Sequence, residues 1–149
     1  MAEVEKSVLI AHSAEQMFEL VDRCEAYPLF LPWCSHTECS FRDAHKTVGT
    51  LYINYHGVKS HFTTENEKVY PVSMRIRLVD GPFRHLEGSW RFRALTADAC
   101  KVEFCLHYEF SSRILEKVIG PVFHHISNTF VEAFVQRAEQ VHGVHGARA

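Results

Sequence analysis

The sequence has no long hydrophobic run, no excess of charge of one sign and no repeated or low-complexity segment. No apolar run approaches the roughly 20 residues that a helix needs to span a bilayer, so we expect any membrane contact to be peripheral. The formal net charge of -2 provides no general attraction to nucleic acid, and we predict no DNA partner. Because no linker-like segment interrupts the 149 residues, they predict one domain over 1–142 and a loose tail over 143–149.

The cysteines are few and are not spaced for disulfides. The chain has five, an odd number, and none form a CxxC pair. Glu3, Glu5 and Lys6 stand where a secretory signal would need apolar residues. Together these features predict a reduced protein of the cytoplasm, at most peripheral to the inner membrane.

The sequence also lacks the common signatures of catalysis and of metal binding. It contains no GxGxxG, GxxxxGK, GxSxG or HExxH. Cys34, His36 and Cys39 lie close together, but no second ligand pair accompanies them, so buried or half-buried thiols are the better interpretation. On a helix, the neighbouring His124 and His125 diverge by about 100° and do not form a metal pair. We therefore predict a binding protein, with no catalytic residue, no metal and no cofactor.

The first part of the chain predicts a strand and two short helices. Residues 4–11 alternate weakly between polar and apolar. Ser13 and Gln16 form a capping box, which begins a helix. A proline-bounded aromatic segment follows at 27–33.

From residue 35 to 110 the apolar period is two, which indicates strands with one buried face. The clearest strands are 72–78, 86–93 and 102–110, and weaker ones are 35–45, 48–56 and 59–69. With 4–11 they make seven strands. After residue 112 the period becomes helical as far as Val141, and Gly120 with Pro121 predicts a kink in this long helix.

Keeping the apolar residues on one face fixes how the last three strands pair. The predicted rows are Leu78–Leu86–Tyr108, Ile76–Gly88–Leu106 and Met74–Trp90–Phe104. Gly88 in mid-strand removes volume from the inner face, which predicts an apolar space around it, beneath residues 126–134 of the last helix. The same glycine also suits a bulge or a close approach of the long helix, and the sequence leaves these alternatives open beside the apolar space.

The residues predicted to line this space are apolar or aromatic and come from the aromatic segment, the strands and the last helix. They are Tyr27, Phe30, Trp33, Leu51, Ile53, Met74, Ile76, Gly88, Trp90, Phe104, Leu106, Tyr108, Ile126, Phe130 and Phe134. Such a lining suits a quinone ring and an isoprenoid tail. The alternative is a fully packed core that uses the same residues.

Basic residues on the opposite face of the sheet predict a different kind of site. Contacts with RNA phosphates would need such side chains, and the candidates are Arg84, Arg91, Arg93 and Lys101. The register also places Arg77 opposite Glu87 and Arg91 opposite Glu103. Paired charges of this kind favour a solvated face over a docking site for phosphates.

Several segments of the chain resemble one known family. They are SAEQMFELV at 13–21, YPLFLPWC at 27–34, GPF with LEGSW within 81–90, and FVEAF at 130–134. The family is START-like and contains the mitochondrial coenzyme Q-binding proteins and the bacterial ribosome association toxin RatA. It is also grouped with polyketide cyclase/dehydrase and lipid-transport domains. The resemblance covers nearly the whole chain, and the string at 27–34 is its most specific part.

The resemblance implies an α+β helix-grip fold. In this fold a curved seven-stranded antiparallel sheet is closed by a long C-terminal helix, with two short helices after the first strand. It implies no settled catalytic residues. Our leading hypothesis is that the chain binds ubiquinone or a related isoprenoid lipid as a carrier or chaperone that supports respiration. The alternative is a RatA-like toxin that binds the large ribosomal subunit and blocks subunit association. An enzyme acting on a hydrophobic substrate ranks last, because no acid and base converge.

Overall fold

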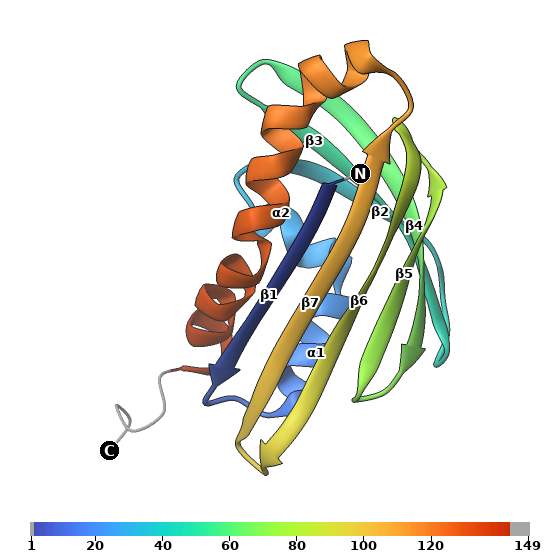
Figure 1. The fold of residues 1–149 in the computed structure, drawn as a ribbon. Helices are drawn as coiled ribbons and strands as arrows, with labels where there is room; N and C mark the ends of the chain where they lie inside the picture. The colour runs from blue at the N-terminus through green and yellow to red at the C-terminus, as the bar shows by residue number, and fades with distance from the viewer. Residues whose placement is uncertain (1, 144–149) are drawn as a thin grey trace.

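Seven antiparallel strands form one curved sheet in the computed structural model, which describes residues 2–143 (Figure 1). The strands are β1 (Ala2–Ile10), β2 (Cys34–Arg42), β3 (Lys46–Tyr55), β4 (Val58–Val69), β5 (Ser73–Asp80), β6 (Phe83–Thr96) and β7 (Ala99–Phe110). Their order across the sheet is β1-β7-β6-β5-β4-β3-β2, so β1 and β2 are its edges. The predicted sheet is confirmed, and the predicted tail lies, from residue 144 on, outside the described residues.

Two short helices follow β1, as predicted. They are α1 (Ala14–Asp22) and the 3-10 helix η1 (Cys24–Leu29). The capping box is formed. The backbone N–H of Gln16 donates to the Ser13 hydroxyl at 3.1 Å, and the backbone N–H of Ser13 donates to Oε1 of the Gln16 side chain at 3.0 Å. These bonds satisfy backbone donors that the first helical turn leaves unpaired.

Replacing Ser13 by Ala is expected to lower the free energy of unfolding by about 1 kcal/mol, because the N-terminus of α1 loses its side-chain acceptor. Chemical denaturation of the purified protein measures this loss. Ser13→Asp is the control, since an aspartate at the same position still accepts the bond. An unchanged denaturation midpoint for Ser13→Ala would contradict a stabilising cap.

The long helix α2 (Arg113–His142) lies across the concave face of the sheet (Figure 1). The Ser112 hydroxyl caps it by accepting from the Leu115 N–H at 3.2 Å. Pro121 lies inside the helix, which continues through it, and Figure 1 shows the first turns inclined to the rest. No helix among residues 2–143 is long and apolar enough to cross a membrane.

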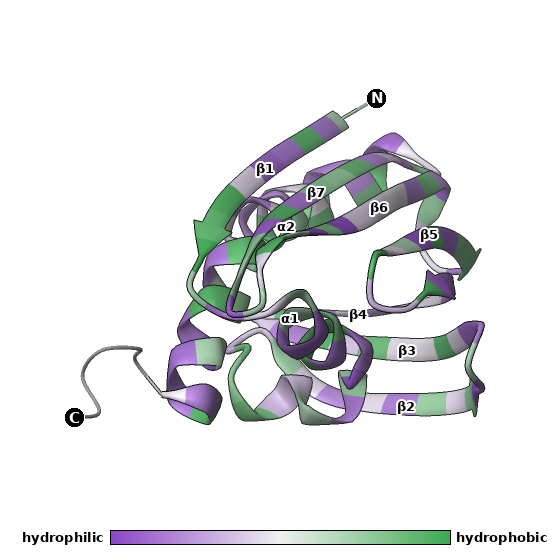
Figure 2. Cartoon of the chain, turned by 90° about the horizontal axis from the view of Figure 1, so that it is seen from below, coloured by the Kyte–Doolittle hydropathy of each residue, from purple (hydrophilic) through white to green (hydrophobic). Residues whose placement is uncertain are grey.

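The predicted strand register is confirmed where the structure defines it. Met74 pairs with Trp90 and Trp90 with Phe104, while Ile76 pairs with Gly88 and Gly88 with Leu106. Figure 2 shows the hydrophobic and hydrophilic bands that alternate along the strands. The hydrophobic side faces α1 and α2 and forms the core.

Candidate functional site

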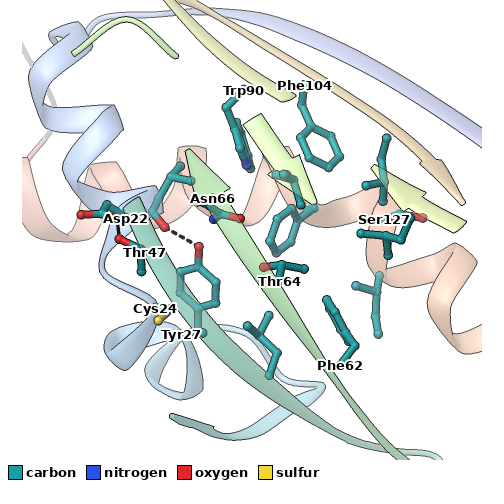
Figure 3. Close-up of a pocket in the computed structure, with 18 of the residues that line it drawn as sticks. Asp22, Cys24, Tyr27, Thr47, Phe62, Thr64, Asn66, Trp90, Phe104 and Ser127 are labelled. Atoms are coloured by element: carbon teal, nitrogen blue, oxygen red, sulfur yellow. Dashed lines mark hydrogen bonds between the residues drawn. The ribbon is translucent and has the colours of Figure 1, made fainter. Parts of the chain in front are cut away.

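A cavity of about 80 Å³ lies between the sheet and α2 (Figure 3). Its lining is mainly apolar, with polar groups toward one end. The lining residues are Val21, Asp22, Cys24, Tyr27, Trp33, Thr47, Gly49, Leu51, Phe62, Thr64, Asn66, Ile76, Leu86, Trp90, Phe104, Leu106, Phe123, Ile126, Ser127 and Phe130.

Nine of the residues predicted to surround an apolar space line this cavity. They are Tyr27, Trp33, Leu51, Ile76, Trp90, Phe104, Leu106, Ile126 and Phe130. The six others do not, and they are Phe30, Ile53, Met74, Gly88, Tyr108 and Phe134. The structure therefore gathers most of the predicted set around one space and uses the rest in packing.

Close packing explains most of the residues outside the lining. Met74 and Phe134 are both only 1% exposed, and the Phe134 ring lies edge-on at 5.5 Å from the Trp90 ring. Tyr108 is also buried, and its hydroxyl lies 3.5 Å from Nδ1 of His124. Phe30 packs under the Arg137 guanidinium, which lies 5.2 Å from its ring centroid. These side chains support the walls of the cavity from behind.

Gly88 serves a close approach of backbone, so the apolar space is not centred on it. A Cβ atom at this position would overlap the carbonyl oxygen of Cys105 and lie 3.0 Å from the Leu106 side chain. Ile76 and Leu106, the cross-strand neighbours of Gly88, line the cavity, whereas Gly88 is not part of the lining. The predicted bulge and the predicted approach of the long helix are both absent at this glycine, and the close approach that the structure shows is to the backbone of β7.

Gly88→Ala is expected to destabilise the protein by about 1–3 kcal/mol, because the added methyl group forces β6 and β7 apart. Thermal or chemical denaturation measures the change. Ser89→Ala, one residue along on the outer face, is the matched control and should be nearly neutral. Equal stability of the two variants would show that β6 and β7 accommodate the added methyl group without strain.

The polar end of the cavity is built around Asp22, at the end of α1. Thr47 donates its hydroxyl hydrogen to one carboxylate oxygen at 2.8 Å, and Lys68 Nζ lies 3.1 Å from the other. The Lys68 side chain is only 5% exposed, so its charge depends on this partner. Asn66 lies beside them, and its Oδ1 is buried without a hydrogen-bond partner among the described residues.

Next to this polar end, Arg42 connects the sheet to η1 through hydrogen bonds. Its guanidinium donates to the Glu25 carboxylate at 2.5 and 2.8 Å and to the Asp22 carbonyl oxygen at 2.8 Å. The hydrogen bond from Arg42 lowers the pKa of Glu25 to about 2. Arg42 thus links the end of β2 to the segment that follows α1.

The thiols near the cavity are held in the protonated form by burial. Burial raises the pKa of Cys24 to about 12 and that of Cys34 to about 11. Cys34 faces the core, whereas the His36 side chain is 63% exposed on the other side of β2. Cys34, His36 and Cys39 therefore do not converge on a common point.

Of the basic residues predicted to contact RNA, Arg91, Arg93 and Lys101 lie together around Glu103 on β6 and β7, and Arg84 lies apart from them. Arg84 lies at the start of β6 and Lys101 at the start of β7, at opposite ends of the sheet. Arg84 is paired with Glu109 at 2.9 Å. The register pairs Arg91 with Glu103 as predicted, but the side chain that forms an ion pair with Glu103 is Arg93.

The predicted pairing of Arg77 with Glu87 is likewise confirmed for the strand register but not for the ion pair. The two residues are opposite each other on β5 and β6, but the Arg77 guanidinium forms its ion pair with Glu65 of β4. Part of the charge on the outer face is thus neutralised across strands, as predicted, but with different partners.

Comparison with known proteins gives one family for nearly the whole chain. The family model described as polyketide cyclase / dehydrase and lipid transport matches residues 10–135. The chain is 41% identical over 143 residues to the ribosome association toxin RatA of Vibrio cholerae, which covers 96% of this chain and 99% of that protein.

More distant similarities extend to a quinone-binding protein and to an enzyme. The chain is 27% identical over 145 residues to the mitochondrial coenzyme Q-binding protein COQ10 homolog B of Xenopus laevis, covering 95% of this chain and 59% of that protein. The crystal structure of the Zhui aromatase/cyclase from Streptomyces sp. R1128 superposes with a TM-score of 0.77 at 17% identity, covering 97% of this chain and 98% of that one. At that identity, the likeness to the cyclase shows the fold alone, which is the predicted helix-grip fold.

Proposed function

The chain belongs to the polyketide cyclase / dehydrase and lipid transport family, and we propose that it acts on the ribosome by binding the large subunit and blocking subunit association. The observation that carries this proposal is the 41% identity to a ribosome association toxin over nearly the full length of both chains. The coenzyme Q-binding relative is less similar, at 27%, and the chain spans 59% of it. The order of the two hypotheses from the sequence is therefore reversed.

The size of the cavity supports a function carried by the protein surface. Pockets that hold drug-sized ligands measure roughly 300–1,000 Å³. The cavity under α2 measures about 80 Å³, which is enough for a few water molecules. A quinone with an isoprenoid tail would need the helix and sheet to separate, whereas binding to a ribosomal subunit needs no such change.

Sedimentation of ribosomal subunits tests the proposal. Purified protein is added to separated small and large subunits under conditions that favour their association, and the mixture is resolved on a sucrose gradient. We expect the peak of joined ribosomes to fall, and the protein to move with the large subunit in a salt-sensitive manner. Protein that stays at the top of the gradient at low salt, with joined ribosomes undiminished, would refute the proposal.

Binding of a hydrophobic ligand is the second candidate function. The observation in its favour is a cavity wall that contains the rings of Trp90, Phe104 and Phe130, within 4.6 to 5.7 Å of one another. Aromatic walls of this kind suit a quinone ring. Native mass spectrometry of protein purified from its own host, with organic extraction, tests it. Protein that carries no quinone and takes up no added ubiquinone would exclude this candidate.

We propose binding without catalysis for either candidate. The carboxylate in the cavity wall, Asp22, already accepts a hydrogen bond from Thr47 and forms an ion pair with Lys68. Its two oxygens are thus engaged in holding the fold, and a general base needs a free lone pair directed at the substrate.

A further inference from the structure

The outer face of the sheet carries a row of three rings at its β2 edge, in which two histidines are exposed and the tyrosine between them is half-buried. His36 of β2, Tyr52 of β3 and His61 of β4 are cross-strand neighbours. The Tyr52 ring lies 5.4 Å from each histidine ring, tilted by 40° to His36 and stacked at 29° on His61. Three aligned rings on a sheet surface form a stacking platform of the kind that single-stranded nucleic acid uses.

The row is fixed in position and open at both ends. The Tyr52 hydroxyl donates to Glu38 at 2.9 Å, and the same carboxylate lies 3.7 Å from Nε2 of His36. β2 is an edge of the sheet, so no further strand follows His36. On the other side, the pairing of β5 with β4 ends opposite Thr63, two residues short of His61. The outward faces of both histidines are therefore available for stacking.

A groove of about 320 Å³ lies beside this row. Its walls include Tyr52 and His61 together with Asn54, Lys59, Ser35 and Ser60. Lys59 and His61 are both exposed and lie on the same side of β4, because they are two residues apart. The groove thus combines ring faces with an ammonium group, a carboxamide and hydroxyls, which can contact the base, phosphate and sugar of a nucleotide.

The acidic residues in the walls distinguish this groove from another groove on the β1–β7–β6 half of the sheet. Lys59 forms no ion pair among residues 2–143, and none of the groove's lining residues is acidic. The groove that contains Lys6, Arg91 and Arg93 is also lined by Glu5 and Glu103. Carboxylates repel phosphate, so the groove at Lys59 is the better complement to an RNA backbone.

We propose that the groove beside Tyr52, Lys59 and His61 binds an unpaired segment of ribosomal RNA, an assignment that rests on the ribosome-directed function proposed above. A base stacks on the outward face of His61, and Lys59 pairs with the adjoining phosphate. This surface differs from the one that the sequence indicated, because the cross-strand alignment of the rings and the lack of carboxylates in the groove lining become visible only in the folded sheet, where Glu38 contacts the row at Tyr52 and His36.

Binding of variants to large subunits and to a short single-stranded RNA tests this assignment. We expect Lys59→Glu and His61→Ala each to weaken both interactions about tenfold. Arg23→Glu and His45→Ala, which change exposed side chains near the other end of the sheet, should bind like the unchanged protein. Thermal melting of every variant should stay unchanged, because all four side chains are exposed.

The possible outcomes distinguish a wrong assignment of the groove from a wrong proposed function. If the unchanged protein binds large subunits and the groove variants bind equally well, while Arg91→Glu and Lys101→Glu do not, the groove is wrong and the function stands. The unchanged protein is also titrated with the short RNA and followed by NMR. If the groove variants no longer bind the subunit but this titration shifts no signals from β3 and β4, a ribosomal protein is the partner and the RNA assignment fails. If the unchanged protein does not bind subunits, the proposed function fails, and the NMR titration decides the groove by itself.

Discussion

Replacing Asp22 by Ala is expected to lower the free energy of unfolding by about 3–5 kcal/mol, one of the two largest losses that we predict for a single substitution. The variant leaves the Lys68 ammonium, whose side chain is 5% exposed, without the carboxylate that now lies 3.1 Å away. It also removes the acceptor of the Thr47 hydroxyl. Chemical denaturation followed by circular dichroism measures the loss.

A second substitution shows whether the uncompensated charge is the cause. Asp22→Leu combined with Lys68→Met removes both charges and should recover most of the stability, because apolar residues of similar size often replace a buried ion pair at little cost. If Asp22→Ala alone loses less than about 1 kcal/mol, Lys68 reaches solvent without its partner and the pair contributes as weakly as one on the surface.

The parts of the fold that follow from alternation could be predicted from the sequence. In β5, β6 and β7 the inward positions hold large apolar residues, so parity alone fixes rows such as Met74–Trp90–Phe104, and the structure has them. The capping box of α1 was predictable for a similar reason, because it depends on residues three apart in the chain. Local sequence patterns are sufficient to predict the structure where each residue clearly favours either the core or the solvent side.

The polar end of the cavity could not be predicted in the same way. The inward positions of β4 are Phe62, Thr64, Asn66 and Lys68, of which one is apolar. Counting in steps of two from Phe62 would have placed the others inward. Nothing in the sequence indicates that the lysine meets Asp22, which is 46 residues away and belongs to a helix. Long-range pairing of charges requires the fold.

The ion pairs on the outer face show the same limit. Parity correctly placed Arg77 opposite Glu87, but a strand residue has neighbours on both sides and on the diagonals. The Arg77 side chain reaches Glu65 on β4 instead of Glu87 on β6. The register is therefore a consequence of the pattern, whereas the choice of charged partner depends on side-chain geometry.

Trp90→Ala is the other substitution with a large expected effect, a loss of about 3–5 kcal/mol. Trp90 is 2% exposed, and its ring lies 4.6 Å from Phe104, 5.7 Å from Phe130 and 5.5 Å from Phe134. Truncation removes these contacts and opens a larger void next to the existing cavity. Leu29→Ala is the control, since Leu29 is 74% exposed and should change stability by no more than about 0.5 kcal/mol.

The same variant separates the two candidate functions when it is assayed well below its melting temperature. Trp90 contributes to the inner wall of the cavity, whereas Tyr52, Lys59 and His61 lie on the outer side of the sheet. Folded Trp90→Ala protein should therefore bind large ribosomal subunits as tightly as the unchanged protein, while any uptake of ubiquinone should change. Loss of subunit binding by a variant that is still folded would show that the ribosome contacts depend on the cavity, and it would contradict a function located on the outer face.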